Sequence, residues 1–356
     1  MWGDRARQRF AKNRAAVVGA ILVAALVLFA LFGPLLSSHG PLTSEFVGGA
    51  APDDRPVGPS ASFLLGADIL FRDQFVRLAY GARLSLLIAL AATAIATVIG
   101  GAVGIVAGYT EGNEGWVVPW ASILALVVAL ALWTSGHGGW AALSLVGAVA
   151  AVGVGTARPQ LRCGVVNTRK LDSTTNLFRV GVRLNLDTTL MRTVDVGLAF
   201  PFLLLVMAIG AALDRTTAGS IVATLGLTGW LGTARIIRSK ALLIRNLDFV
   251  VAARALGQST ANILVRHLLP NVVGPLIVIA TISVAQMIVA ESVLSYLGVG
   301  ISPPAPTWGQ MLYQGQESFP LAPWTLAAPA TAILVAVFGF NLMGEGLRDA
   351  LDPRDE

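Results

Sequence analysis

The residue types that most often carry catalysis, or bind metal ions and nucleotides, are few and scattered in this sequence. The lysines are Lys12, Lys170 and Lys240. None follows a glycine, so the Gly-Lys-Ser/Thr loop that cradles nucleotide phosphates is absent. The histidines are His39, His137 and His267, with no His-Glu-x-x-His zinc motif among them. We therefore expect no catalytic residue, no metal site and no cofactor, and any pumping must draw its energy from another subunit.

The composition is that of a membrane protein. Of 356 residues, 55% are hydrophobic and only 13% are charged, about half the charged share of a typical soluble domain. Several apolar blocks exceed the roughly 20 residues that cross a hydrocarbon layer as a helix. The run from 15 to 36 follows a basic N-terminus but exceeds the about 7–15 apolar residues of a signal peptide, so we expect a retained first span.

Apolar blocks bounded by charged residues, glycine or proline predict an all-α, polytopic protein. The third and fourth blocks are short and are joined by Ser135-Gly136-His137-Gly138. They are either a tight membrane hairpin or a re-entrant element. The predicted spans are 15–36, 82–108, 117–134, 139–157, 192–213, 218–238, 273–297 and 323–344.

The positions of the positive charges predict the orientation. With the N-terminus inside and the spans alternating, most of the 25 lysines and arginines lie in inside segments, as the positive-inside rule requires. The exceptions are Arg55, Arg72, Arg77, Arg83 and Arg215. This places both termini in the cytoplasm, and it leaves no single basic face, so no nucleic-acid partner is expected.

The inside segment 239–272 is neither apolar enough to span a membrane nor rich in glycine and proline. It predicts a helix ending at Gly257, a second short helix capped by Ser259 or Thr260, and a stop at Pro270. The spacing of Ala252, Ala253 and Leu256 puts them on one helix face, a small, flat surface suited to a partner's groove. An ordinary cytoplasmic loop with an interfacial helix explains the same residues.

This segment resembles the EAA motif of the permeases of binding-protein-dependent ABC importers. Ala252, Ala253, Gly257, Leu269 and Pro270 match the motif in type and spacing. Two positions depart from the motif: Val251 replaces the usual glutamate, and His267 replaces the usual hydrophobic residue. We hypothesise that Asp248, one helical turn before Val251, supplies the missing carboxylate. The resemblance implies a coupling helix that docks on an ATPase subunit. The residues assigned to this contact are Asp248, Ala252, Ala253, Arg254, Gly257, His267, Leu269 and Pro270.

Other blocks are similar to the "C" permeases of the dipeptide, oligopeptide and nickel branch. They begin at Arg9 (RFAKNR), Leu65 (LGAD), Glu291 (ESVLSYLGVG) and Phe340 (FNLMGEGLRDALDPR). The resemblance covers about 1–110 and 188–356, in order. It implies the type I importer fold with about six core spans and an inserted two-helix hairpin. It also implies a second homologous permease, two ATP-binding subunits and an extracytoplasmic substrate-binding protein, in a bacterial inner membrane.

The implied organisation has five parts. Residues 1–36 form the cytoplasmic N-terminus and first span, and 37–81 an extracytoplasmic loop. The second core span is 82–112, followed by an insertion at 113–187 with a basic tail. The core permease domain is 188–356, with the coupling loop 239–272 inside it.

A few residues inside the membrane or at its edge stand out. Glu291 lies within the seventh span, where an ionisable group normally faces the bundle interior or water, so a structural or gating role is expected, with direct substrate contact in the pathway as the alternative. Gly104 belongs to the repeat Gly100, Gly104 and Gly108, which favours close helix packing, with a pathway or hinge role as the alternative. We expect Asp68, Arg72 and Asp73 to order the outer loop, and Trp308 and Trp324 to be interfacial anchors.

The sequence thus predicts a permease subunit that forms half of a translocation pathway for peptides or related small solutes, by alternating access driven by partner ATPases. Membrane lipid surrounds it. The alternative functions are a self-contained secondary transporter or channel, and a membrane-embedded enzyme. Intramembrane charges, which a self-contained transporter needs at its substrate site, are scarce.

Overall fold

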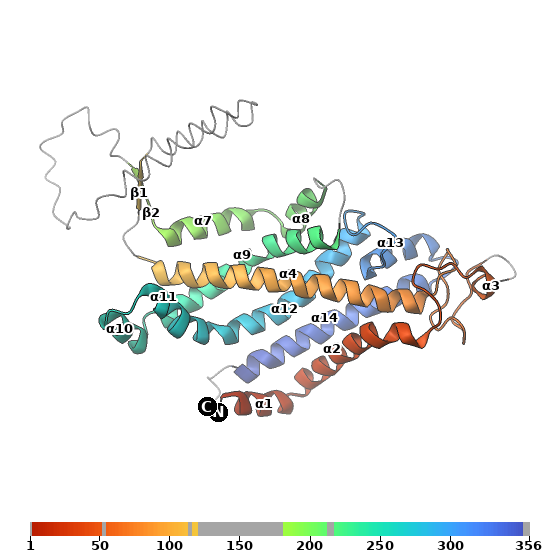
Figure 1. Ribbon diagram of the computed structural model, residues 1–356, viewed down its shortest axis with the longest axis horizontal. Coiled ribbons are helices and arrows are strands. Elements are labelled where there is room, and N and C mark those ends of the chain that lie inside the picture. Colours follow the sequence, from red (N-terminus) through yellow and green to blue (C-terminus); the bar gives the residue numbers. More distant parts are fainter. Residues whose placement is uncertain (1, 52–54, 113–115, 120–180, 212–216, 352–356) are drawn as a thin grey trace, which may run out of the picture. The chain divides into compact units, whose positions relative to one another are not determined.

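The computed structural model describes residues 2–51, 55–112, 116–119, 181–211 and 217–351 (Figure 1). The chain divides into two compact units, 1–108 with 194–356, and 109–193. The first unit is a bundle of long apolar helices. In the second, β1 (Trp116–Pro119) pairs antiparallel with β2 (Gly181–Leu184).

Five helical segments in the described residues are long and apolar enough to cross a membrane. A bent sixth is formed by α7 (Leu186–Ala199) and α8 (Phe202–Ala211). The predicted all-helical membrane fold is confirmed. The five are α2 (Arg14–Phe32) with η1 (Gly33–Leu36), α4 (Gln74–Thr110), α9 (Ala218–Ile244), α12 (Leu269–Tyr296) with the short helices before it, and α14 (Trp324–Leu351).

The predicted fifth span, 192–213, is not one straight helix. The axes of α7 and α8 meet at 84° across Phe200 and Pro201. A proline disfavours helical geometry in the residue before it and has no amide hydrogen to continue the ladder, so α7 ends here and α8 starts in a new direction.

Most of the predicted third and fourth spans lies outside the described residues. Residues 117–119, at the start of the third, belong to β1 and not to a helix. The limits of the 113–187 insertion stay a prediction.

Short elements lie at the two ends of the bundle (Figure 1). At the end where α4 finishes lie α1 (Trp2–Lys12), α10 (Asp248–Ala255), α11 (Thr260–Ile263) and the π-helical turn η2 (Leu264–Leu268). The opposite end holds α3 (Phe46–Gly49) and α13 (Trp308–Ser318). Asn13 Nδ2 donates to Asp349 Oδ2 at 3.1 Å, so the N-terminal and C-terminal helices meet at the end that carries α10.

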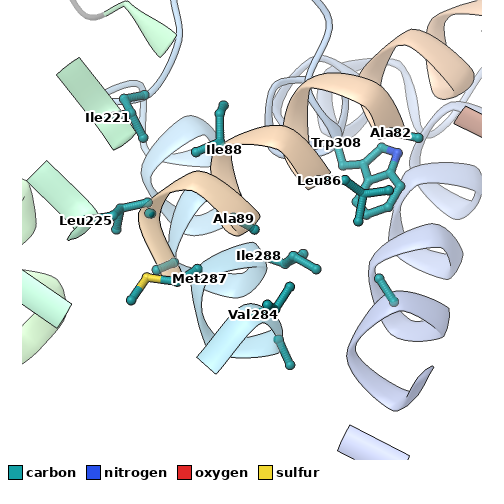
Figure 2. Close-up of a cluster of buried hydrophobic side chains, with 14 of the residues drawn as sticks. Ala82, Leu86, Ile88, Ala89, Ile221, Leu225, Val284, Met287, Ile288 and Trp308 are labelled. Atoms are coloured by element: carbon teal, nitrogen blue, oxygen red, sulfur yellow. The ribbon is translucent and has the colours of Figure 1, made fainter. Parts of the chain in front are cut away.

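The core lies where α4, α9 and α12 pack together (Figure 2). Ile88 and Ala89 of α4, Leu225 of α9 and Ile288 of α12 are all fully buried. Met287 of α12, almost as deeply buried, points to the α9 side of this cluster. One side of α12 is therefore closed by hydrophobic contacts.

Glycines bring α4 and α9 into backbone contact. A Cβ at Gly104 would lie 2.6 Å from the carbonyl oxygen of Ala234, and one at Gly100 would lie 2.7 Å from that of Trp230. A Cβ at Gly108 would lie 2.6 Å from the carbonyl oxygen of Arg238 and 2.6 Å from the Cβ of Ala241. The predicted packing of this glycine repeat is confirmed, because only a residue without Cβ allows so close an approach. A pathway or gating role of Gly104 stays a prediction.

Candidate functional site

Helix α10 ends as the sequence predicts, at a glycine. Gly257 adopts φ +75°, the left-handed region. Its amide donates to the carbonyl of Arg254, and the next amide, of Gln258, donates to that of Ala253. These two bonds form a Schellman motif, which satisfies carbonyls at the helix end. Asp248, in the first turn, adds a negative charge where the helix dipole favours one.

The prediction that Ala252, Ala253 and Leu256 share one face is wrong for Ala253. Ala253 is buried together with Val250, since these two residues form the inner side of α10. Ala252 is exposed, and Leu256 is 81% exposed at the tip. The outer side also carries exposed apolar residues, which the sequence reasoning missed: Leu247, Phe249 and Val251. Asp248 and Arg254 are exposed on it as well. The outer surface is therefore larger and more apolar than the alanines alone suggest.

The predicted stop at Pro270 is also wrong. The cap of α11 is Ser259, whose hydroxyl accepts the amide of Asn262, and the chain then runs through η2 into α12 without a break. Pro270 lies in the first turn of α12, where its missing amide hydrogen costs little. The π-helical turn before it shifts the hydrogen-bond ladder by one residue, and the Asn271 side chain donates to the carbonyl of His267 at 2.6 Å. The exposed Leu269 and Pro270 thus begin a span.

His267 holds the two halves of the loop together. Its Nε2 lies 3.1 Å from Gln258 Oε1, which also accepts from the side chain of Asn262. Its ring lies 6.0 Å from that of Phe249 on α10, centre to centre. His267, which is half-buried, thus stabilises the loop by joining its two helical parts.

Glu291 lies in a fully buried hydrogen-bond network. Its Oε2 accepts from Ser85 Oγ of α4 at 3.0 Å, and its Oε1 accepts from Ser295 Oγ at 2.8 Å. Ser85 Oγ in turn accepts the backbone amide of Trp308, the first residue of α13. Glu291 therefore faces the bundle interior, as predicted, and connects α12 through Ser85 to α4 and α13.

Trp308 is not an interfacial anchor. Its side chain is fully buried, and its Nε1 donates to the carbonyl of Leu78 at 3.2 Å. The buried Thr307 hydroxyl caps α13 just before it. Trp324 is half-buried and donates from Nε1 to the carbonyl of Ala67. Both tryptophans stabilise the end of the bundle that carries α13, because each satisfies its indole N–H inside the protein.

Ionic and polar side chains order the loop between the first two spans, residues 37–81, as predicted. Asp68 pairs with Arg72 at 2.7 Å and with Arg77 at 3.5 Å. Both arginines also donate to Gln314 Oε1 of α13. Asp73 accepts the amide of Phe75 at the start of α4. These contacts join the loop, α4 and α13 into one cap. No sequence pattern pointed to the role of Arg77 or Gln314.

A cavity of about 600 Å³ opens between α7, α8, α9, α12 and α14. Its wall includes the break between α7 and α8, and the polar residues Thr228, Ser283, Gln286 and Asn341. Glu291 and Gly104 do not line it. Sequence reasoning missed this site, because single amides in apolar helices give no periodic signal, and because the consecutive helices α7, α8 and α9 meet α12 and α14 from later parts of the chain.

These features define a helical membrane component with a protruding loop helix and an open cavity inside the bundle. Comparisons with known proteins agree. Residues 180–355 match the family described as binding-protein-dependent transport system inner membrane component. Residues 1–48 match the N-terminal TM domain of oligopeptide transport permease C.

Full-length relatives support the same family. The chain is 31% identical over 353 residues to the dipeptide transport system permease protein DppC of Alkalihalophilus pseudofirmus, covering 99% of this chain and 90% of that protein. It is 30% identical over 354 residues to the oligopeptide transport system permease protein OppC of Bacillus subtilis, with the same coverage. For OppC of Escherichia coli the identity is 30% over 355 residues, 100% of this chain and 92% of that protein.

The chain therefore belongs to the ABC importer permeases, the inner membrane components of binding-protein-dependent transport systems. It is a multi-pass inner membrane protein and a transport subunit without catalytic function. Membership implies an ATPase subunit and a substrate-binding protein as partners. This sets aside the self-contained transporter and the membrane enzyme.

Proposed function

We propose that this chain is one of two homologous permease subunits that together import peptides, with two ATP-binding subunits docked on the α10 loops. The relatives' names supply the peptide class, since they are dipeptide and oligopeptide permeases. One observation carries the coupling role: α10 presents an exposed outer surface with Leu256 at its tip, while its inner side is buried in the loop. A helix with an exposed apolar surface can dock in a groove of a partner protein. Because the inner side of α10 is packed in the loop, a movement of the bound partner would be transmitted through the loop to the spans that follow.

The N- and C-termini lie in the cytoplasm in this proposal. Both termini and α10 share one end of the bundle (Figure 1), and that end carries the basic residues of α1 and of the α10 loop. The positive-inside rule then puts this end inside and α13 outside, where the substrate-binding protein delivers its cargo.

Within this proposal, eight residues serve the ATPase contact in two ways. Asp248, Ala252 and Arg254 lie on the outer surface of α10 and touch the partner directly. The remaining five hold its shape: Ala253, Gly257, His267, Leu269 and Pro270. Asp248 supplies the carboxylate that Val251 does not.

The test is purification of a tagged chain from native membranes in mild detergent, with mass spectrometry of the co-purified proteins. A second permease, ATPases with Walker motifs and a peptide-binding protein are the expected companions. Recovery of the chain alone, with no ATP hydrolysis after the candidate ATPases are added, would refute the proposal. Asp248→Ala should uncouple ATP hydrolysis from uptake, and a fully coupled variant would remove the role given to that carboxylate.

A further inference from the structure

The cavity lies near mid-length of the helices that form it. Ser283 and Gln286 are near the middle of α12, Gly232 is at the middle of α9, and Asn341 is just past the middle of α14. The break between α7 and α8, at Phe200 and Pro201, also lines the cavity. Since these helices span the membrane, the cavity is near the bilayer midplane.

The polar groups that the structure describes on the cavity wall are uncharged, and two of them are exposed without hydrogen-bond partners. Among the residues that the structure describes, none that lines the cavity is charged. Gln286 and Asn341 are exposed, and neither carboxamide bonds to any residue that the structure describes. A carboxamide has two N–H donors and a carbonyl acceptor, and leaving these against hydrocarbon is strongly unfavourable. Their partners must therefore come from outside the described residues, and water or a ligand with amide groups has the matching donors and acceptors.

The helix break points to the same conclusion independently. The last carbonyls of α7 have no helical amide partners beyond Pro201. Non-helical backbone at membrane depth is tolerated only where it is buried in protein or lines a water-filled cavity. Phe200 is exposed, so burial by the part of the chain that the structure describes does not explain the break. Broken spans in other transporters place substrate sites at the midplane for this reason.

We propose that this cavity is the hydrated part of the pathway in this subunit, and that Gln286 and Asn341 bind the main-chain amides of the peptide in transit. The inference rests on the proposed peptide permease function. Carboxamides match the donor and acceptor pattern of a peptide group, which every peptide shares. Because the described wall carries no charged side chain, it offers no counter-ion, and we expect no selection among peptides by side-chain charge.

The first experiment measures hydration in the complete transporter. In a Cys163→Ser background, Gln286→Cys and Asn341→Cys are treated with a membrane-impermeant cationic thiosulfonate, with and without trialanine and the binding protein. Leu334→Cys is the matched control, because Leu334 is exposed on α14 but does not line the cavity. We expect both cavity cysteines to react, trialanine to slow them at least threefold, and the control to stay unmodified. No reaction in any nucleotide state means that lipid or a partner helix fills the cavity, and overturns the proposal.

The second experiment measures uptake of tripeptides with alanine, lysine or glutamate in the centre. Gln286→Leu and Asn341→Leu should each lower uptake of all three by a similar factor, roughly 3- to 10-fold for one lost hydrogen bond. Gln286→Glu should create selection where there was none, favouring the lysine peptide over the glutamate peptide by roughly tenfold. Unchanged uptake by the leucine variants, or a strong charge preference in the wild type, contradicts the inference.

The two proposals fail in different ways. If the wild-type transporter with its ATPases imports none of these peptides, the proposed substrate class is wrong. If it imports them and the variants behave like the wild type, only the inference about Gln286 and Asn341 is wrong.

Discussion

Two polar residues of α12, little more than one turn apart, lie in opposite environments. Glu291 is fully buried and accepts hydrogen bonds from Ser85 and Ser295. Gln286 is exposed in the cavity and has no hydrogen-bond partner among the described residues. The same helix thus builds a closed side that holds α4 and α13 in place, and an open side for a solute. Inside a membrane, a polar side chain stabilises the fold where neighbouring residues form its hydrogen bonds. Where they do not, its polar groups are available to a solute.

The largest effect is expected on the closed side. Glu291→Ala leaves the hydroxyls of Ser85 and Ser295 without an acceptor and creates a cavity, so the free energy of unfolding should fall by about 3–5 kcal/mol. Thermal unfolding of the purified complex measures the loss. Gln286→Ala is the control and should change stability by less than about 0.5 kcal/mol. If both variants lost the same free energy of unfolding, the distinction between the buried side of α12 and the side that faces the cavity would be wrong.

Helix packing gives the next effect. A Cβ at Gly104 meets the backbone of α9, so Gly104→Ala should cost about 1–3 kcal/mol of stability through overpacking. At Gly232, on the open side of α9, nothing lies within 4 Å of an added Cβ. Gly232→Ala should leave stability unchanged or raise it slightly. Denaturation of both variants in parallel compares the two faces, and a stable Gly104→Ala would show that α4 and α9 can separate without loss.

A third test distinguishes a role of the exposed surface of α10 in binding the ATPase from a role in the stability of the fold. Leu256 is 81% exposed, so Leu256→Asp should leave stability within about 0.5 kcal/mol of the wild type. If the ATPase covers Leu256, losing its burial should lower substrate-stimulated ATP hydrolysis by roughly tenfold. The control is Leu42→Asp, since Leu42 is exposed in the loop 37–81, far from α10 in the sequence. ATP hydrolysis by the transporter with this variant should be normal. Normal hydrolysis in Leu256→Asp would place the docking surface elsewhere.

The smallest effect is expected inside the loop. His267→Ala loses the contact with Gln258 and the ring contact with Phe249, which should loosen the loop locally by about 0.5–1.5 kcal/mol. Hydrogen exchange over 258–268 should rise while global unfolding stays the same. His267→Phe keeps the ring contact only and should fall between the two. Unchanged exchange in His267→Ala would mean that the loop holds its shape without this residue.

The end of α10 shows what sequence reasoning can determine. Gly257 and Ser259 fixed a helix end and a helix start correctly, because caps depend on residues within a few positions of each other. Pro270 misled the same reasoning, since a proline both ends helices and begins them. Ala253 and Trp308 were misplaced because burial depends on which elements pack around a residue, and local spacing does not record that.

The sequence by itself determined the membrane class, the family and the loop that carries its motif, since long apolar blocks and short-range caps are properties of contiguous residues. Only the tertiary structure decided that Glu291 is satisfied while Gln286 is open, and that the fifth span is broken beside a cavity. Those distinctions depend on which distant helices meet α12: α4 and α13 on the side of Glu291, and α7, α8, α9 and α14 around the cavity. Whether a polar side chain in a membrane is an anchor or a contact point is set by the neighbours that the fold brings to it.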